Sequence, residues 1–130
     1  PATLKLAARA KGPDGVILVT DAMAGTGMPD GEYTLGGVVV TVRDGIARDP
    51  DGALAGSTLT MERAVANMAA ASGMGLAAAL TMATHTPARA LGIGERKGRV
   101  APGYDADLVA LEEDLTVALT MVAGEVVFRR

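Results

Sequence analysis

Asp21 is the residue whose place in the chain most favours chemistry. It directly follows the continuous apolar and β-branched run VILVT at 16–20 and precedes a glycine-rich segment. Such a run predicts a strand covered on both faces, as in a parallel sheet. Barrel enzymes place catalytic groups at the C-terminal ends of strands of this kind. A turn-initiating aspartate is the competing interpretation, and the residues around Asp21 favour the two about equally.

Three other motifs give weaker signals. The GTG segment at 25–27 is followed by chain breakers, whereas a dinucleotide fingerprint requires its glycines to open a helix. Ser57 lacks the second glycine of a nucleophile elbow, because Leu59 stands at that position, so we expect Ser57 to cap a helix. His85 is the only histidine, and a capping or loop role is a better prediction for it than general base.

We expect no metal site within the chain itself. One histidine and no cysteine cannot supply the usual three protein ligands of a catalytic zinc, and the carboxylates are not spaced as in a calcium loop.

Composition excludes several classes of protein. The net charge is −3, with no basic stripe and almost no aromatic side chains, so nucleic-acid binding is not expected. No apolar stretch is long enough to span a membrane. The absence of cysteine excludes disulfides and agrees with a cytoplasmic location. The start, Pro1-Ala2-Thr3, is typical of neither a signal peptide nor a natural initiation, and indicates a cut into a longer chain.

The remaining elements follow from periodicity and turn signals. Residues 22–37 are expected to form a long loop, followed by a hairpin in which Asp44-Gly45 joins strands at 38–42 and 46–48. Helices are predicted at about 60–72, 76–83 and 86–92, the last with Thr86 as its cap. Strands are then expected at 106–111, 117–122 and 125–128. A lone parallel-type strand cannot form a sheet, which also indicates a fragment.

Several segments together resemble N-acetylglucosamine-6-phosphate deacetylases, which are members of the amidohydrolase superfamily. The segments are TDAM at 20–23, PDGEY at 29–33, LGG at 35–37, LAGSTLTM at 54–61, PARALG at 87–92 and KGRVAPGYDADLV at 97–109. The last is shared with the wider superfamily, whereas TDAM combined with LAGSTLTM is specific to the deacetylases.

The resemblance implies an α/β fold. Residues 1–96 would be the C-terminal part of a (β/α)8 barrel with a β-hairpin insertion, in which 16–20 is the eighth strand. Residues 97–130 would be the C-terminal strands of a small β-sandwich domain. The other barrel strands would then lie upstream.

The resemblance also implies a reaction and its participants. The full-length enzyme would hydrolyse the acetamide of N-acetylglucosamine 6-phosphate, using a divalent metal ion, zinc or iron, that activates a water molecule. Asp21 would be the acid/base, and the backbone of Leu54, Ala55 and Gly56 would contact the substrate. The metal ligands and the phosphate-binding groups would lie upstream, so the isolated chain would be inactive, and the full-length enzyme would be a homodimer.

Two alternatives stay open. One is another amidohydrolase, such as a cyclic amidase or an amino-acid deacetylase, with the same aspartate in the same role. The other is a non-catalytic binding module, if the chain is naturally this short.

Overall fold

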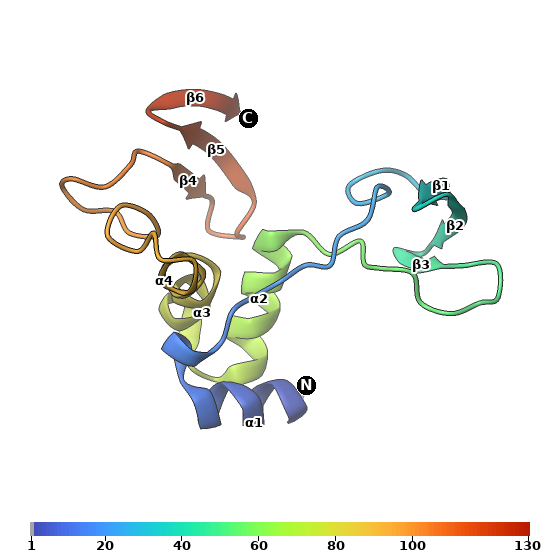
Figure 1. Cartoon of the computed structure of the whole chain (residues 1–130), viewed down its shortest axis with the longest axis horizontal. Coiled ribbons are helices and arrows are strands. Elements are labelled where there is room, and N and C mark those ends of the chain that lie inside the picture. Colours follow the sequence, from blue (N-terminus) through green and yellow to red (C-terminus); the bar gives the residue numbers. More distant parts are fainter. Residues whose placement is uncertain (1) are drawn as a thin grey trace. The chain divides into compact units, whose positions relative to one another are not determined.

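The computed structural model describes residues 2–130, which form two compact units, one made of 2–18 with 65–130 and one made of 19–64 (Figure 1). Both units contribute to an α/β chain whose two sheets are antiparallel. The elements are α1 (Ala2–Lys11), a 3-10 turn η1 (Pro13–Gly15), β1 (Gly31–Leu35), β2 (Val38–Arg43), β3 (Ile46–Arg48), α2 (Met61–Ser72), α3 (Gly75–Ala83), α4 (His85–Ala90), β4 (Leu108–Leu111), β5 (Val117–Val122) and β6 (Glu125–Arg129).

The first unit is built on the apolar faces of its helices. Val65 and Met68 of α2 are buried at helical spacing and form one cluster with Ala79 and Met82 of α3. The helix predicted from about residue 60 is therefore confirmed. It ends where predicted, because Gly73 takes a left-handed φ of 71° directly after Ser72.

The helix α1 was missed by the sequence analysis, which assigned no structure to the start of the chain. Ala8 of α1 has no exposed surface and belongs to the same apolar cluster. The signal that could have indicated a helix is its charge pattern, since Arg9 and Lys11 occupy the last turn, where the helix dipole favours cations.

The run at 16–20 does not form the predicted strand. Val16 is extended, with φ −127° and ψ 133°, and both Val16 and Leu18 pack against the helical cluster, while Ile17 and Val19 are exposed. The backbone amide of Leu18 donates to the carbonyl of Met82 at 3.1 Å. The segment thus has the alternation of a half-buried strand, but residues 2–130 offer it no neighbouring strand to complete a ladder.

The helix predicted at 86–92 begins earlier, at His85, and Thr86 is not its cap. Thr86 is buried, and its hydroxyl donates to the carbonyl of Pro13 at 2.8 Å. The hydroxyl is therefore used in a contact between distant parts of the chain, which a local capping pattern cannot reveal.

The second unit contains a sheet of order β1-β2-β3 around a small core of Met23, Val40, Val42 and Ala47. The predicted hairpin is confirmed, and its turn residues Asp44 and Gly45 have φ values of 51° and 71°. The strand β1 lies within the segment expected to be loop.

Tyr33 of β1, which pairs with Val40 of β2, packs against that loop. A Cβ on Gly25 would lie 2.7 Å from the Tyr33 ring, so glycine permits the loop to close over the ring. The Tyr33 hydroxyl also donates to the carbonyl of Pro29 at 2.5 Å.

The chain ends in an antiparallel sheet of order β4-β5-β6, joined between β5 and β6 by the predicted Ala123-Gly124 turn. β4 begins at Leu108 rather than at 106, because Ala106 and Asp107 bind the backbone amides of that turn instead of a neighbouring strand.

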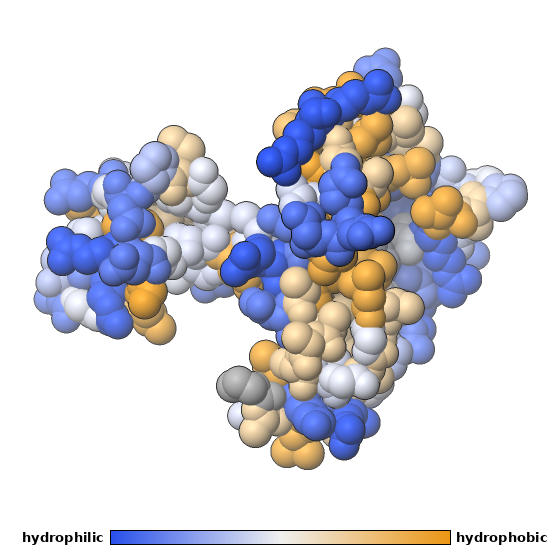
Figure 2. All heavy atoms as spheres, turned by 180° about the vertical axis from the view of Figure 1, so that it is seen from behind, coloured by the Kyte–Doolittle hydropathy of each residue, from blue (hydrophilic) through white to orange (hydrophobic). Residues whose placement is uncertain are grey.

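Many apolar side chains stay exposed, including Val126, Val127 and Phe128 of β6, and Figure 2 shows such surface in orange. Among residues 2–130, no helix combines the length and the apolar character needed to cross a membrane.

Candidate active site

Asp21 lies where the extended segment ends and meets a distant part of the second unit. Its carbonyl oxygen accepts a hydrogen bond from the amide of Ser57 at 2.8 Å, and the amide of Met23 donates to the carbonyl of Ser57 at 2.9 Å. These bonds form a parallel bridge between Ala22 and Ser57. Asp21 itself has φ 53°, a left-handed conformation that aspartate tolerates better than most residues, and its side chain is exposed.

Gly56 is the residue that allows this close approach. It has φ 76°, and a Cβ at this position would lie 3.3 Å from the carbonyl oxygen of Asp21 and 3.2 Å from the Cβ of Met23. Any larger residue would be strained and crowded against the backbone of Asp21. The structure therefore brings together Asp21 and Gly56, two residues that the sequence analysis predicted for one site.

Leu54 and Ala55 complete the segment and are held by β3. Leu54 forms a bridge with Arg48, and the amide of Ala55 donates to the carbonyl of Ala47 at 3.1 Å. The side chain of Leu54 is 71% exposed, whereas Ala55 packs against the core of the unit. The backbone of the segment is thus held in place by β3, while the side chain of Leu54 stays exposed.

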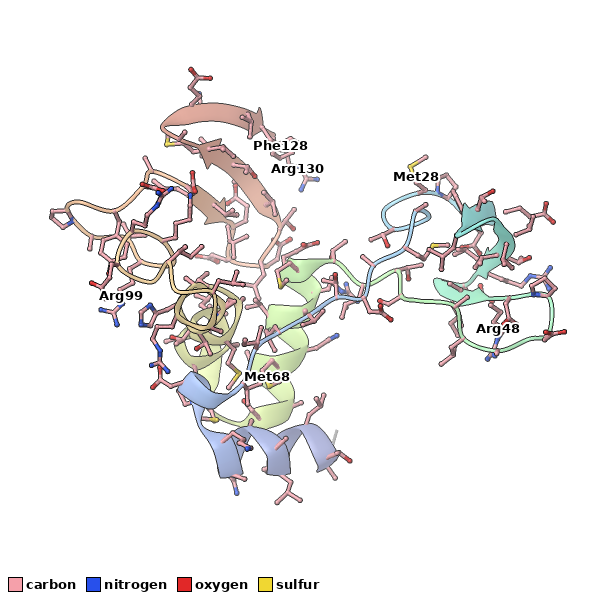
Figure 3. All side chains as sticks on the ribbon, in the orientation of Figure 1. Met28, Arg48, Met68, Arg99, Phe128 and Arg130 are labelled. Atoms are coloured by element: carbon pink, nitrogen blue, oxygen red, sulfur yellow. The ribbon has the colours of Figure 1, made fainter. Side chains whose placement is uncertain are left out.

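The turn before Leu54 is also anchored to β3. Arg48 donates from Nη1 to the carbonyl of Gly52 at 2.5 Å, and the position of Arg48 is labelled in Figure 3. Asp49 accepts the amide of Ala53 at 2.8 Å. These contacts fix the approach of the chain to Leu54.

An open cavity of about 620 Å³ lies against the same segment. Its walls include Leu54, Gly56, Ser57, Thr58, Thr60 and Arg63. A volume of this size falls in the range of small-molecule sites. Asp21 is not among the lining residues, whereas Gly56 and Ser57, which lie against its carbonyl oxygen, are.

Ser57 does not lie in a nucleophile elbow, and it is not the cap of α2. Its Oγ accepts the amide of Leu59 at 2.8 Å, which closes a local turn, and its carbonyl accepts the hydroxyl of Thr26 at 3.0 Å. The residue directly before α2 is Thr60, whose carbonyl accepts the amide of Ala64 at 2.9 Å.

His85 lies in the other unit, at the start of α4. Arg99 Nε donates to His85 Nδ1 at 3.3 Å, and Arg99 Nη2 lies 2.8 Å from His85 Nε2. A Cβ on Gly98 would approach the Cα of His85 to 2.8 Å, so the chain before Arg99 packs directly on the start of the helix. His85 is therefore a helical residue whose ring contacts Arg99, and the prediction of a capping or loop residue was wrong.

Arg96 and Lys97 form an ion cluster with Asp105 and Asp107. Arg96 Nη2 and Lys97 Nζ lie 3.0 and 2.9 Å from Asp105 Oδ2, and Lys97 also pairs with Asp107. The hydrogen bonds to Asp107 and Asp105 raise the pKa of Lys97, while the hydrogen bonds from Lys97 lower the pKa of both aspartates. The cluster joins the segment after α4 to the start of β4.

Residues 2–130 contain no group of three histidine, cysteine, aspartate or glutamate side chains placed to hold a metal ion. The donor set of residues 2–130 therefore does not fit a metal centre.

Arg63, which lies in the cavity wall, was not predicted from the sequence. The available signal was its position, because a cation in the first turn of a helix opposes the helix dipole. The contact between Asp21 and Ser57 had no local signal, since it joins segments far apart in the sequence.

Comparisons with known proteins find relatives that match most of the chain. A deacetylase from Lysinibacillus sphaericus, named for N-acetylglucosamine-6-phosphate, is 43% identical over 123 residues, which cover 95% of this chain and 32% of that protein. An N-acetylgalactosamine-6-phosphate deacetylase from Escherichia coli O157:H7 is 44% identical over 110 residues, or 85% of this chain and 29% of that protein.

The fold is similar to that of solved deacetylases. One is an aspartate-to-alanine mutant of the N-acetyl-D-glucosamine-6-phosphate deacetylase from Mycobacterium smegmatis, in complex with N-acetyl-D-glucosamine-6-phosphate. It has a TM-score of 0.86 and 42% identity, and the match covers 97% of this chain and 34% of that chain. The present chain thus spans about a third of the length of these relatives.

One protein family matches nearly the whole length of the chain. A sequence model of the Amidohydrolase family matches residues 14–127, which include Asp21, the segment at 54–56 and the strands β1 to β5. The chain belongs to the amidohydrolase family.

Proposed function

We propose that the full-length protein hydrolyses the acetamide of N-acetylglucosamine 6-phosphate, giving glucosamine 6-phosphate and acetate. The observation that carries the proposal is the placement of Asp21 against Gly56 and Ser57, within the motifs that distinguish the deacetylases. It is supported by relatives of that name at more than 40% identity. Because the chain spans about a third of their length, the activity is proposed for the full-length protein.

Asp21 is the proposed acid/base. As the water oxygen attacks the amide carbonyl carbon, the carboxylate of Asp21 accepts a proton from that water. The same proton then passes to the amide nitrogen as the carbon–nitrogen bond breaks, so that acetate and a free amine leave. The exposed carboxylate is accessible for both transfers, and general acid–base catalysis of this kind contributes roughly 10²–10⁴-fold.

The backbone at Leu54, Ala55 and Gly56 is the proposed contact surface for the sugar. This backbone is held by β3 and by the bridge between Ala22 and Ser57, and the open cavity adjoins it. A backbone fixed on both sides loses little freedom when a substrate binds, which favours affinity.

The proposed architecture of the full-length protein is a (β/α)8 barrel with a small β-sandwich. Residues 1–96 would belong to the barrel, with 16–20 as its last strand, and 97–130 to the sandwich. The alternation of buried and exposed side chains at 16–19 supports the assignment of a strand that lacks its neighbours within residues 2–130.

The proposed cofactor is a divalent metal ion, zinc or iron, which would polarise the amide carbonyl when bound. Its ligands are proposed to come from outside this chain, because residues 2–130 hold no suitable group. A homodimer in the cytoplasm is the proposed state of the full-length protein.

A second candidate substrate is N-acetylgalactosamine 6-phosphate, because the relative named for this sugar is as similar to the chain as those named for the glucosamine. The two sugars differ in the configuration of one hydroxyl and share both the acetamide and the phosphate.

Acetate release by the purified full-length protein tests the proposal. The substrates to compare are the two sugar phosphates, unphosphorylated N-acetylglucosamine and a cyclic amide. We expect the highest kcat/KM with N-acetylglucosamine 6-phosphate. A preference for the galactosamine would select the second candidate, and a preference for the cyclic amide would refute both. The 130-residue chain alone is expected to release no acetate and to bind no stoichiometric zinc.

A further inference from the structure

The backbone of Ser57 is held by the glycine-rich loop that follows Asp21. The amide of Ser57 donates to the carbonyl of Asp21 at 2.8 Å, and its carbonyl accepts the amide of Met23 at 2.9 Å. The same carbonyl accepts the hydroxyl of Thr26 at 3.0 Å. Within residues 2–130, Thr26 is the one residue whose side chain donates to the backbone of Ser57. A substitution of Thr26 can therefore weaken this arrangement while every backbone donor and acceptor is kept.

A tight turn fixes the place of the Thr26 hydroxyl. The amide of Thr26 donates to the carbonyl of Met23 at 2.9 Å, which closes the turn at 23–26. Gly25 is buried in this turn, and a Cβ there would lie 2.7 Å from the Tyr33 ring and 3.0 Å from the sulfur of Met23. Thr26 is half-buried, and its branched Cβ restricts rotation of the side chain. The hydroxyl is thus held ready for its bond to Ser57.

Asp21 has a backbone conformation that needs support from its surroundings. Its φ of 53° is left-handed, and such a conformation in a residue other than glycine persists only where neighbouring contacts impose it. The contacts that impose it come from Ser57, through the hydrogen bond, and from Gly56, through its close approach. Because the side chain of Asp21 is exposed, the direction of its carboxylate depends on this backbone.

We propose that Thr26 is a positioning residue for Asp21. By donating to the carbonyl of Ser57, the Thr26 hydroxyl holds the peptide whose amide binds the carbonyl of Asp21. This inference rests on the proposed function, in which Asp21 is the acid/base. Thr26 acts through Ser57 and neither accepts nor delivers the proton of the reaction.

The backbone proposed to contact the sugar is held by other bonds. The amide of Ala55 donates to the carbonyl of Ala47 at 3.1 Å, and Leu54 forms a bridge with Arg48. These contacts come from β3 and not from the loop that carries Thr26. Loss of the Thr26 hydroxyl should therefore lower kcat, which depends on the acid/base, and leave KM largely unchanged.

The test compares acetate release by Thr26→Val and Thr26→Ser in the full-length protein, with the preferred sugar phosphate. Valine keeps the shape of the side chain and removes the donor. We expect kcat to fall about tenfold to a hundredfold and KM to change less than about twofold, because a small displacement of a catalytic group can cost about 10²-fold. Thr26→Ser keeps the hydroxyl and should restore most of kcat. In an Asp21→Asn background, Thr26→Val should lower kcat little further, because both changes affect the same group.

Hydrogen exchange gives a readout that does not depend on turnover. The amides of Met23 and Ser57 should exchange faster in Thr26→Val than in the unmodified protein, because both donate within the arrangement that the hydroxyl holds. The matched control is Tyr33→Phe, which removes the hydrogen bond to the carbonyl of Pro29 at the other end of the same loop. The control should leave kcat and the exchange of the Ser57 amide unchanged.

Unchanged kcat or unchanged exchange of the Ser57 amide in Thr26→Val would overturn the proposal. Equal losses of kcat in Thr26→Val and in either Thr26→Ser or Tyr33→Phe would overturn it as well. An undiminished effect of Thr26→Val in the Asp21→Asn background would show that Thr26 does not act through Asp21. Failure of the proposed function looks different, since the unmodified protein would then release no acetate from either sugar phosphate, while the exchange measurement would still decide whether Thr26 holds Ser57.

Discussion

The carbonyl oxygen of Asp21 and the backbone amide of Ser57 are joined by a hydrogen bond of 2.8 Å, which links two segments far apart in the sequence. This bond, together with the close approach of Gly56, fixes the backbone of Asp21 in its left-handed conformation. The carboxylate is thus attached to a rigid backbone while its own side chain stays exposed. Precise placement of this kind is what general acid–base catalysis requires.

Replacement of Asp21 by asparagine should remove the proton acceptor and leave the fold intact. Asparagine also tolerates a positive φ, so the backbone at 53° is preserved. In the full-length protein we expect kcat to fall by about 10²–10⁴-fold, because the acid/base is lost. Measurement of kcat, metal content and the thermal midpoint checks this expectation.

Asp51→Asn is the control, because Asp51 is an exposed turn residue of the same unit. It should leave kcat unchanged. A variant Asp21→Asn that retained near-normal kcat would show that Asp21 is not the acid/base, whatever its effect on stability.

Local patterns in the sequence predicted the elements that depend on neighbours in the chain. The Asp44-Gly45 turn predicted the hairpin, and apolar spacing predicted α2 and α3, because side chains a few positions apart determine these structures. The Ala123-Gly124 turn predicted the connection between β5 and β6 for the same reason.

Elements that depend on distant contacts were predicted less well. The strand expected at 16–20 has no partner within residues 2–130, and Thr86 uses its hydroxyl on Pro13 instead of capping α4. For the candidate site, Asp21 and Gly56 were predicted from motifs, but their contact could not be, because it exists only after the second unit folds. The roles of Asp21 and of 54–56 stay predictions.

Gly56→Ala should damage both stability and activity. Alanine at a φ of 76° costs about 1–2 kcal/mol, and its methyl group would lie 3.3 Å from the carbonyl oxygen of Asp21. The backbone of Asp21 must then shift, so we expect kcat/KM to fall as well. Urea denaturation and acetate release measure the two effects.

Gly52→Ala is a matched control for Gly56→Ala. Gly52 has a similar φ of 84°, but a Cβ there would meet nothing within 4 Å. The control should therefore lose a similar amount of backbone stability and keep its activity. Equal losses of kcat/KM in the two variants would mean that the contact with Asp21 is unimportant for the reaction.

Thr86→Val should destabilise the first unit. The substitution keeps the shape of the side chain but removes the donor to Pro13, and the carbonyl of Pro13 then loses a buried partner. We expect a loss of about 1–3 kcal/mol in the free energy of unfolding. Thr81→Val is the control, because its hydroxyl bonds only the carbonyl of Ala77 on an exposed part of α3. The control should change stability by less than about 0.5 kcal/mol, and a similar change in both variants would refute the role given to Thr86.

The ion cluster at Lys97 should make stability depend on pH in two windows. The pKa values of Asp105 and Asp107 lie below their ordinary value of 3.8 in the folded protein. Their contribution to the free energy of unfolding is therefore present above pH 3.8 and is lost as the pH falls through the lower pKa values of the folded protein. The pKa of Lys97 lies above its ordinary 10.5, so its contribution is present below 10.5 and is lost as the pH rises through the higher, folded value.

Lys97→Met should remove both contributions, because it removes the shared partner of the two aspartates. The urea midpoint of this variant should lie below that of the unmodified protein near neutral pH, and the two midpoints should converge in strong acid and in strong base. High salt should narrow the difference, since the cluster is partly exposed. Lys5→Met, at an exposed position of α1, is the control and should leave the pH profile unchanged. If the urea midpoints of Lys97→Met and the unmodified protein differed by the same amount at every pH, Lys97 would stabilise the protein through packing and not through its charge.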